Sequence, residues 1–295
     1  MILCAGEALI DMLPRDTAEG AAFLPVAGGA VFNTAIALGR LGAPVAFHSG
    51  LSTDLFGDQL AAALDQSGVV DRTARADRPT TLAFVTLTDG HAEYAFYDEG
   101  TAGRMLTPDD APETGDVTAL FLGGISLAVE PCAAAYEALA LRHPDLPLMV
   151  DPNIRPGFIA DPGTYRARLN RILAVADIVK LSDEDMAWLG TTPEEVLSRG
   201  PRAVCLTEGA RGATAITASG TVRVPAQTVE VVDTVGAGDT FNAGVLAGLH
   251  EAGALARDRI DADALRGALE LGVAAAAVTV SRAGANPPRR SELAA

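Results

Sequence analysis

Short apolar runs that alternate with helical patterns constrain the fold of this chain more than any other feature. The runs have the length and composition of strands that are buried on both faces of a sheet. They are Ile2–Ala5, Val45–Ser49, Ala119–Leu122, Leu148–Val150, Ile178–Leu181 and Ala203–Leu206. Helical spacing predicts helices over Val31–Leu41, Leu55–Gln66, Pro131–Leu141, Thr164–Ala174, Asp183–Trp188, Ala237–Leu249 and Ala262–Ser281. The alternation predicts an α/β fold with a doubly wound, mainly parallel sheet flanked by helices, and ligands of such sheets bind at the strand carboxyl ends.

One region departs from this alternation. Two β-rich runs, 80–87 and 92–97, flank the dipeptide Asp89-Gly90, which is a hairpin signal. Their alternation of polar and apolar residues predicts a strand pair with one covered face. The chain has no internal repeat, low-complexity tract or long linker, so we expect residues 1–295 to form a single domain.

Charge and hydropathy exclude several kinds of partner. The formal net charge of -16 argues against nucleic acid and anionic membranes, since both reward basic patches. No apolar run reaches the roughly 18 residues that span a bilayer, and no basic leader precedes Ile2, so we expect a cytoplasmic protein. The cysteines are odd in number, widely spaced and set in apolar contexts, which predicts buried free thiols.

The segment Asp233-Thr234-Val235-Gly236-Ala237-Gly238-Asp239-Thr240-Phe241 carries the chemistry. Apolar residues at helical spacing follow it, and the run 229–232 before it predicts a strand, so the glycine-rich turn lies at a helix N-terminus. Free N–H groups there, on Gly236, Ala237 and Gly238, would point at a phosphate, with the helix dipole adding attraction. The turn therefore predicts a phosphate-transfer site.

Asp239 follows this turn, where a carboxylate is suited to proton transfer. A hydroxyl that attacks a phosphoryl group loses its proton late, and an aspartate of ordinary basicity can accept it. An acid in the first turn of a helix is equally consistent with a helix cap, and for a lone Gly-x-Gly-Asp both interpretations stay open. The chain has no Walker A motif because its only lysine, Lys180, follows Val179 rather than Gly.

The nine-residue segment resembles the C-terminal signature of the ribokinase-like PfkB sugar kinases, which has the form D-T-x-G-A-G-D-x-F. Upstream, the glycine-rich stretch 28–42 resembles their N-terminal signature, and further segments match in order from 6–11 to 281–285. The resemblance covers essentially the whole chain. It implies a ribokinase-like fold with a small β lid, formed by about 12–27 and 78–100, over the sugar.

The resemblance implies roles for residues near the sugar. Asp11 would accept hydrogen bonds from neighbouring hydroxyls, Asn33 would orient the sugar, and Gly28 and Gly29 would let the backbone meet it. On the residues alone, Asp11 and Asn33 are equally consistent with turn or cap duty. Arg155, in a D-P-N-x-R segment like that of bacterial fructokinases and 2-keto-3-deoxygluconate kinases, would bind phosphate or a substrate oxygen. A loop-ordering salt bridge with Asp151 or Asp161 is the alternative.

The resemblance also implies a nucleotide side with ATP and Mg²⁺. ATP-binding positions would be Lys180, Ser182, Thr207, Gly209, Gly212 and Gly238. Asp185 stands where the family carries Glu and would bind Mg²⁺ through water, although Ser182 and Asp185 also resemble a helix capping box. A simple β-turn is the alternative for the loop that starts at Thr207. Asp233 lies where relatives bind a monovalent cation, which would be K⁺.

Substrate choice depends on the segment 96–102, where 2-keto-3-deoxygluconate kinases carry an arginine for the acid. This chain has Asp98 and Glu99 there, and carboxylates would repel an acid. We therefore expect a fructokinase-like enzyme that phosphorylates O6 of D-fructose, with Asp239 as the general base. The alternatives are a 2-keto-3-deoxygluconate kinase, another sugar or nucleoside kinase of the family, or an inactive sugar-binding regulator. We expect small-molecule partners, and a homodimer through the lid stays open.

Overall fold

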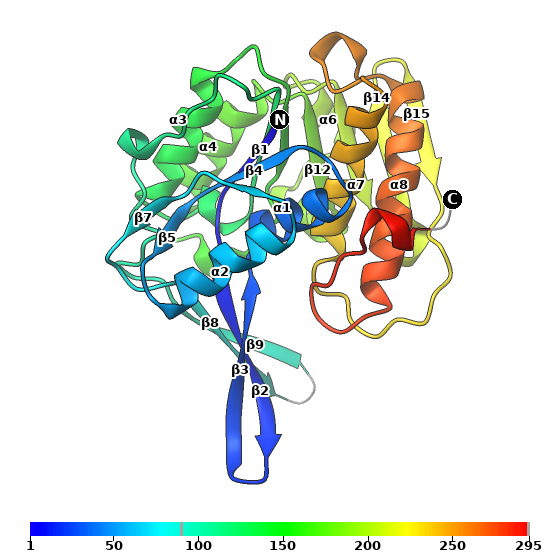
Figure 1. The fold of residues 1–295 in the computed structure, drawn as a ribbon. Coiled ribbons are helices and arrows are strands. Elements are labelled where there is room, and N and C mark those ends of the chain that lie inside the picture. Colours follow the sequence, from blue (N-terminus) through cyan, green and yellow to red (C-terminus); the bar gives the residue numbers. More distant parts are fainter. Residues whose placement is uncertain (89–90, 294–295) are drawn as a thin grey trace.

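The computed structural model describes residues 1–88 and 91–293, and a nine-stranded sheet forms its centre (Figure 1). The strand order is β15-β14-β13-β12-β11-β10-β1-β4-β6. The strands are β1 (Ile2–Ala5), β4 (Val45–His48), β6 (Val70–Asp71), β10 (Ala119–Gly123), β11 (Leu148–Asp151), β12 (Ile178–Ser182), β13 (Ala203–Thr207), β14 (Ala213–Thr217) and β15 (Gly220–Val224). The pairs β13–β14 and β14–β15 at one edge are antiparallel and the other pairs are parallel, so the predicted mainly parallel sheet is confirmed for the described residues.

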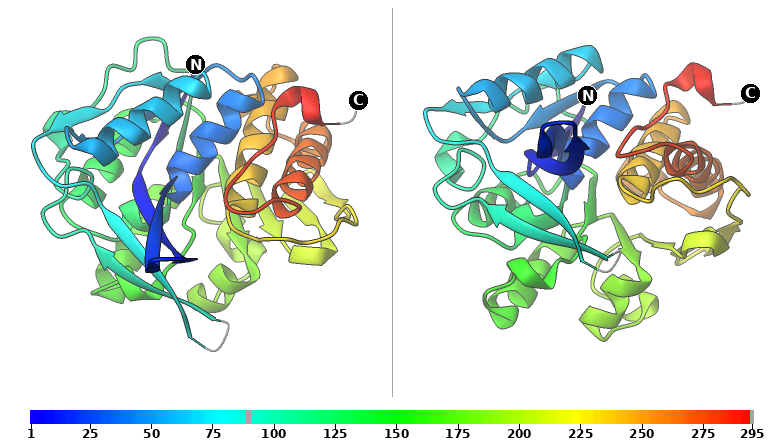
Figure 2. Two further views of the ribbon diagram at one scale, coloured as in Figure 1. Left: turned by 60° about the horizontal axis from the view of Figure 1, so that its bottom comes forward. Right: turned by 90° about the horizontal axis from the view of Figure 1, so that it is seen from below.

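Helices cover both faces of this sheet (Figure 2). They are α1 (Ala30–Arg40), α2 (Leu55–Gln66), α3 (Cys132–Arg142), α4 (Pro162–Leu173), α5 (Asp183–Leu189), α6 (Pro193–Leu197), α7 (Ala237–Glu251) and α8 (Ala262–Val280). Apolar residues of α1, α2, α7 and α8 pack in one core, and those of α3, α4 and α6 in another. All seven predicted helices are confirmed, with ends that differ by up to two residues.

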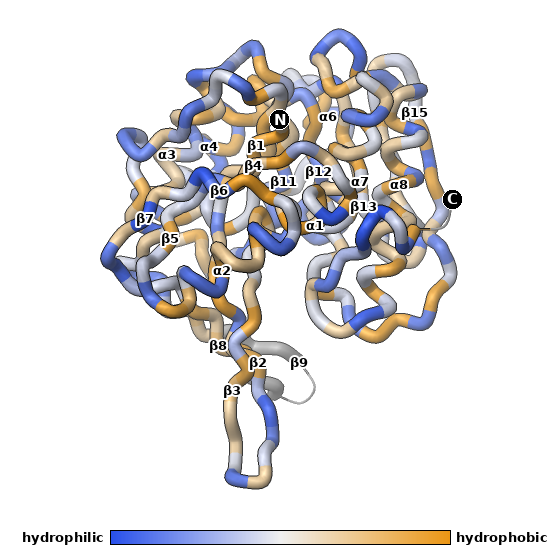
Figure 3. The backbone as a smooth tube through the Cα atoms, in the orientation of Figure 1, coloured by the Kyte–Doolittle hydropathy of each residue, from blue (hydrophilic) through white to orange (hydrophobic). Residues whose placement is uncertain are grey.

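Strand β1 shows why these runs are apolar throughout. Ile2 and Cys4 belong to the core on one face of the sheet, whereas Leu3 and Ala5 belong to the core on the other. Successive side chains of a strand point to opposite faces, so a strand covered on both sides needs apolar residues at every position. Figure 3 shows hydrophobic backbone segments along this central sheet.

A second, four-stranded sheet projects beyond the carboxyl ends of the large sheet, as Figure 1 shows. Its order is β3-β2-β8-β9. The strands are β2 (Leu9–Thr17), β3 (Gly20–Gly28), β8 (Leu82–Thr88) and β9 (His91–Tyr97). Strands β8 and β9 pair antiparallel, which confirms the predicted strand pair, while its turn residues Asp89 and Gly90 lie outside the described residues.

Aromatic rings hold this second sheet together. Phe84 packs edge-on against Phe23 at 5.0 Å and against Tyr97 at 5.4 Å between ring centroids. Such edge-to-face pairs contribute about 0.5–1.5 kcal/mol each beyond the area that they bury. Short strands β5 (Gly50–Ser52) and β7 (Ala74–Ala76) form a third sheet. The 3-10 turns are η1 (Pro108–Asp110), η2 (Gly124–Leu127), η3 (Pro156–Phe158), η4 (Gly209–Arg211), η5 (Arg257–Arg259) and η6 (Arg290–Glu292).

The strand predicted over 229–232 is wrong. This segment has no strand in the structure, and Val231 and Val232 are exposed by 62% and 59%. It runs past the end of α8, where Val232 N and Asp233 N both donate to the carbonyl of Val280. Apolar β-branched residues favour strands only when a neighbouring strand and a covering layer receive them, and this segment has neither in the described chain.

The three cysteines are buried, free thiols. Burial raises the pKa of all three far above the ordinary thiol value, so they are unreactive at neutral pH. None of the helices in the described ranges has both the length and the apolar content required to cross a membrane.

Candidate active site

The glycine-rich turn lies where the sequence predicts it, at the start of α7. Gly236 precedes the helix with a φ of 76°, in the left-handed region that favours glycine. A Cβ on Gly236 would lie 2.7 Å from Cβ of Ala285, so close packing also requires glycine here. No side chain in the described ranges caps α7, so the first turn keeps N–H groups that can bind an anion, although Ala237 N donates to the carbonyl of Thr234 at 3.3 Å.

Asp239 is buried in the first turn of α7, with 8% of its surface exposed. Burial raises the pKa of its carboxyl group to about 7, against the opposing effects of Asn33 and Lys180. Nδ2 of Asn33 donates a hydrogen bond of 2.9 Å to Oδ2 of Asp239. A carboxylate with a pKa near the working pH is suited to accept a proton and release it again. The structure thus places the buried carboxyl group of Asp239 beside the glycine-rich turn.

A buried ion pair lies beside this turn. Nζ of Lys180 is 3.1 Å from Oδ2 of Asp151, and both side chains are almost completely buried. Nδ2 of Asn242 donates to the same carboxylate over 2.7 Å. A Cβ on Gly238 would lie 3.2 Å from Nζ of Lys180, so the ammonium group is immediately beside the turn. The predicted phosphate site therefore combines backbone N–H groups with one buried cation.

Asp151 and Asn242 are part of this cluster although sequence reasoning did not assign them to the site. Each had a signal: Asp151 ends strand β11 at the carboxyl edge of the sheet, and Asn242 follows Asp239 by three residues, on the same side of α7. Burial of Lys180 alone would lower its pKa, but nearby Asp151 and Asp185 outweigh burial and raise it. The two carboxylates therefore favour the ammonium form of Lys180.

The residues expected at the sugar gather where β2, β3 and α1 meet. Asp11 lies in β2, and a Cβ on Gly28 would be 2.2 Å from its Oδ2, so the glycine leaves room for the carboxylate. Gly29 precedes α1 with a φ of 107°, which only glycine adopts readily. Burial raises the pKa of Asp11 to about 6. Asn33 lies one turn into α1 and faces Asp239 rather than capping a helix.

Glu7 fixes the start of α1 and was missed by sequence reasoning. Its carboxylate accepts hydrogen bonds from Ala30 N at 3.1 Å and Ser126 N at 3.2 Å. A side chain on Gly124 would collide with it, since a Cβ there would lie 2.0 Å from Oε1. Burial raises the pKa of Glu7. The residue joins the helix that carries Asn33 to the turn after β10.

A cavity of about 530 Å³ opens between β9 and the loop after β11. Its lining comprises Phe96, Asp98, Arg104, Val129, Arg155, Pro156, Gly157 and Phe158. The rings of Phe96 and Phe158 meet edge-on at 4.3 Å between centroids, which joins the small sheet to η3. In the described part of the chain Arg155 forms no ion pair, so the alternative of a salt bridge with Asp151 or Asp161 is not supported.

The expectation that Asp98 presents a repelling carboxylate requires correction. Oδ1 of Asp98 is 2.7 Å from Nη1 of Arg104, and both residues line the cavity. The ion pair offsets the negative charge, so Asp98 does not repel an acid as an unpaired carboxylate would. Glu99 is exposed and does not line the cavity.

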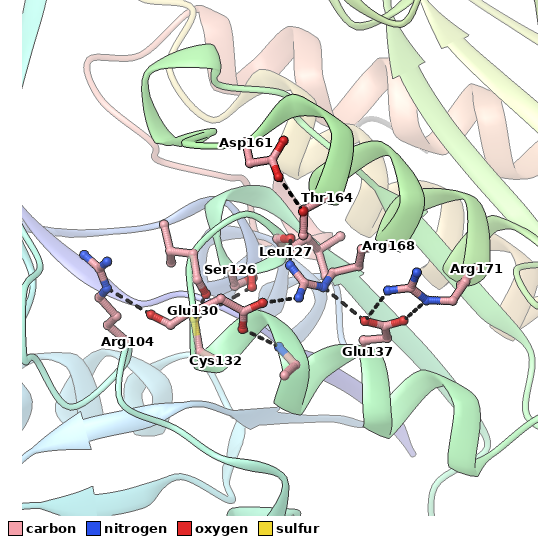
Figure 4. Close-up of polar contacts among 12 residues, drawn as sticks. Arg104, Ser126, Leu127, Glu130, Cys132, Glu137, Asp161, Thr164, Arg168 and Arg171 are labelled. Atoms are coloured by element: carbon pink, nitrogen blue, oxygen red, sulfur yellow. Dashed lines mark hydrogen bonds and ion pairs between the residues drawn. The ribbon is translucent and has the colours of Figure 1, made fainter.

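A chain of polar contacts holds Arg104 in place (Figure 4). Nε of Arg104 donates to the carbonyl of Glu130 over 3.1 Å. The buried side chain of Arg168 pairs with the carboxylates of Glu130 and Glu137, and Arg171 pairs with Glu137 from the other side. The cavity wall is thus tied to helices α3 and α4.

Ser182 and Asp185 form the capping box at the start of α5 that the sequence left open. Oδ2 of Asp185 accepts from N and Oγ of Ser182, and its Oδ1 accepts from Ile154 N at 2.7 Å. Both oxygens are therefore engaged by the protein itself. Across the described ranges, no three His, Cys, Asp or Glu side chains group closely enough to hold a metal ion.

The loop after β13 contains the predicted glycines. Gly212 has a φ of 101°, and a Cβ on it would lie 2.1 Å from the carbonyl oxygen of Val224. Packing against β15 therefore explains Gly212 without a nucleotide. Gly209 has a φ of 56° and open space around it, and Thr207 ends β13 at the carboxyl edge.

Asp233 closes the loop before the glycine-rich turn. Its Oδ1 accepts from Val235 N at 3.0 Å, and its Oδ2 accepts from Gly284 N at 2.8 Å. The carboxylate joins this loop to the segment after α8. The predicted segments 233–241 and 281–285 therefore lie side by side.

Comparisons with known proteins identify the family of this chain and agree with its fold. The model of the pfkB family of carbohydrate kinases matches residues 1–292. A fructokinase from Rhizobium leguminosarum bv. trifolii is 53% identical over 259 residues, which are 84% of this chain and 79% of that protein. The structure of a fructokinase with bound ATP from Xylella fastidiosa is 31% identical with a TM-score of 0.90, and the match covers 99% and 96% of the two chains. A fructokinase double mutant from Vibrio cholerae O395 with fructose, ADP and potassium ion bound is 26% identical with a TM-score of 0.84 and coverage of 96% and 93%.

Proposed function

The chain belongs to the pfkB family of carbohydrate kinases, and on that premise we propose that it transfers the γ-phosphoryl group of ATP to O6 of D-fructose. The observation that carries the proposal is the buried Asp239 beside the uncapped first turn of α7. The names and ligands of the Rhizobium, Xylella and Vibrio relatives support fructose and ATP as the substrates.

Asp239 acts as the general base in this proposal. The sugar hydroxyl oxygen forms a bond to the γ-phosphorus, the bond from that phosphorus to the bridging oxygen breaks, and ADP leaves. The hydroxyl proton passes to the carboxylate of Asp239. N–H groups of Gly236, Ala237 and Gly238 and the ammonium of Lys180 stabilise the negative charge on the transferring group.

Mg²⁺ fits this site through water rather than through direct protein bonds. The oxygens of Asp185 already accept hydrogen bonds from Ser182 and Ile154, so an intervening water suits the carboxylate better. The ion, when bound, offsets charge on the phosphate oxygens. A monovalent cation near Asp233 is part of the proposal because the Vibrio relative binds potassium. Ser182, Thr207 and Gly209 would contact ATP, whereas Gly212 acts through packing.

On the sugar side, Asp11 and Asn33 would bind hydroxyl groups, and Gly28 and Gly29 would leave room for the ring. The four-stranded sheet would act as the lid, and closure would exclude the water that competes with the sugar for the phosphoryl group. A homodimer through this sheet and a cytoplasmic location stay predictions from the sequence.

One observation favours a second substrate class. Arg104 and Arg155 both line the cavity, and guanidinium groups bind carboxylates well. A 2-keto-3-deoxygluconate kinase is therefore the alternative. Asp98 counts against this substrate, because its carboxylate pairs with Arg104 and offsets that positive charge.

The deciding experiment is sugar-dependent ADP formation with MgATP. Fructose, ribose, glucose, adenosine and 2-keto-3-deoxygluconate are compared at equal low concentration. We expect fructose to give the largest kcat/KM. A higher kcat/KM for the keto acid would show that it, and not fructose, is the preferred substrate. Absence of turnover with all five compounds would favour an inactive sugar-binding protein.

A further inference from the structure

One hydrogen bond joins the two halves of the active site. Asn33 lies in the first part of α1, and Asp239, 206 residues later, lies in the first turn of α7. Nδ2 of Asn33 donates to Oδ2 of Asp239 over 2.9 Å. The contact lies between the two side chains themselves, so it can orient the carboxylate of Asp239.

We propose that Asn33 is a positioning residue that holds Oδ2 of Asp239 and leaves Oδ1 to accept the proton of the attacking hydroxyl. This inference rests on the proposed role of Asp239 as the base and deepens it, because it gives the two carboxylate oxygens different tasks. As the new oxygen–phosphorus bond forms and the bond to ADP breaks, the proton moves to Oδ1, while Oδ2 keeps the amide hydrogen.

The backbone that carries Asn33 is held at the start of α1. Asn33 N donates to the carbonyl of Gly29 at 2.8 Å within the first turn of α1. The carboxylate of Glu7 caps that turn through Ala30 N, and the carbonyl of Glu7 accepts from Phe32 N. A donor that is fixed in advance costs little reorganisation when charge changes on its acceptor.

Several charged groups face Asp239 and set its proton affinity. Lys180 on β12 favours the ionised form, as does the amide of Asn33, while Asp151 at the end of β11 and Glu7 after β1 favour the protonated form. A hydrogen bond donated to a carboxylate stabilises the ionised state. Loss of the Asn33 amide therefore makes Asp239 a stronger proton acceptor that is protonated at higher pH.

The pH dependence of kcat separates this role from sugar binding. The second N–H and the oxygen of the Asn33 amide remain available to a sugar, so any substitution of Asn33 also raises KM. At saturation, the pH dependence of kcat reports groups in the enzyme–substrate complex. Substitution of a residue that only binds sugar therefore leaves the acidic limb of the kcat profile at the same pH.

The experiment measures kcat against pH at saturating MgATP and sugar for the wild type, Asn33→Ala, Asn33→Asp and Thr34→Val. We expect the acidic limb to rise by about one pH unit in Asn33→Ala, as for loss of one hydrogen bond to a charged group, and further in Asn33→Asp, which adds a carboxylate. Thr34 is the matched control, because among the described residues its hydroxyl bonds only to the carbonyl of Ala30 in its own helix. Thr34→Val should keep the wild-type profile.

A limb that stays in place in Asn33→Ala while KM rises would overturn the proposal. Thermal unfolding checks that each variant is folded, and Asn33→Ser, whose side chain is too short to reach Oδ2, gives the same readout if the alanine variant does not fold. A wrong assignment of the base gives a different result. Asp239→Asn would then retain turnover and keep the acidic limb of its kcat profile, whatever the Asn33 variants show.

Discussion

The ammonium group of Lys180 lies 3.1 Å from the carboxylate of Asp151, and both are buried immediately beside the turn that precedes Asp239. Removing one member of a buried ion pair leaves an uncompensated charge, which costs about 3–5 kcal/mol. The pair is therefore both a structural and an electrostatic part of the site.

Lys180→Met should lower the free energy of unfolding by about 3 kcal/mol and reduce kcat by at least about tenfold. The double variant Lys180→Met/Asp151→Asn should regain much of the stability, because no buried charge is left alone, but not the activity. Urea denaturation and steady-state kinetics on the single and double variants measure the two effects. A double variant that regains activity as well would limit Lys180 to a structural role.

Asp239→Asn should abolish turnover, with kcat reduced by about 10³-fold or more, while sugar binding largely survives. The amide has nearly the same size and can still contact Asn33, so the pocket keeps its shape. Calorimetric titration with fructose and a coupled ADP assay test the two halves of this prediction. Substantial residual turnover would remove Asp239 as the base.

The same substitution should stabilise the protein at alkaline pH. The pKa of Asp239 is about 7 in the folded protein, above its unfolded value of 3.8. Between these values the folded state binds a proton that the unfolded state lacks, so unfolding free energy falls as pH rises from about 4 to about 7. At pH 8 the wild type is destabilised by the full cost of ionising this buried carboxyl group, at most about 4 kcal/mol. Asp239→Asn has no such cost because its side chain does not ionise. The stability gap between the two proteins should close at pH 4, and a gap that does not change with pH would contradict the prediction.

Asp98→Asn should shift substrate preference toward sugar acids. The change releases Arg104 from its ion pair, so the cavity gains net positive charge next to Arg155. We expect the ratio of kcat/KM for 2-keto-3-deoxygluconate to that for fructose to rise about tenfold. Glu99→Gln removes the same charge from an exposed neighbour outside the cavity lining and should leave the ratio unchanged. Equal shifts in both variants would point to general charge rather than to the ion pair.

Gly28→Ala should raise KM for the sugar while KM for ATP stays near its original value. The new methyl group would lie 2.2 Å from Oδ2 of Asp11 and would force that carboxylate aside. Gly115→Ala provides the control, because a methyl group there meets no atom within 4 Å. An unchanged sugar KM in Gly28→Ala would show that Asp11 does not bind the sugar.

The sequence predicted the main elements because the central strands are apolar on both faces and apolar residues recur at helical spacing between them. It failed at 229–232, where four residues have strand composition but no partner strand. Composition describes what a segment can bury and does not state what will cover it.

The site was predictable where one local segment contains both the turn and the reactive group, as at Gly236–Asp239. It was not predictable where residues from distant segments meet. Glu7 bonds to Ser126, and Asp151 to Asn242, across 119 and 91 residues, and no local pattern shows that these partners meet. The pairing of Asp98 with Arg104 shows a related limit, because net charge at a cavity depends on side-chain directions.

The contact between Asn33 and Asp239 also bears on how the protein is made. Translation produces the sugar-facing helix long before the helix that carries the base, since 206 residues separate the two partners. A ribosome that stalls or a protease that cuts between them yields a fragment with the sugar-facing residues but without Asp239 and its turn. If Asp239 is the base, as proposed, such a fragment transfers no phosphate, and kinase activity would then report that the polypeptide has been extended through α7.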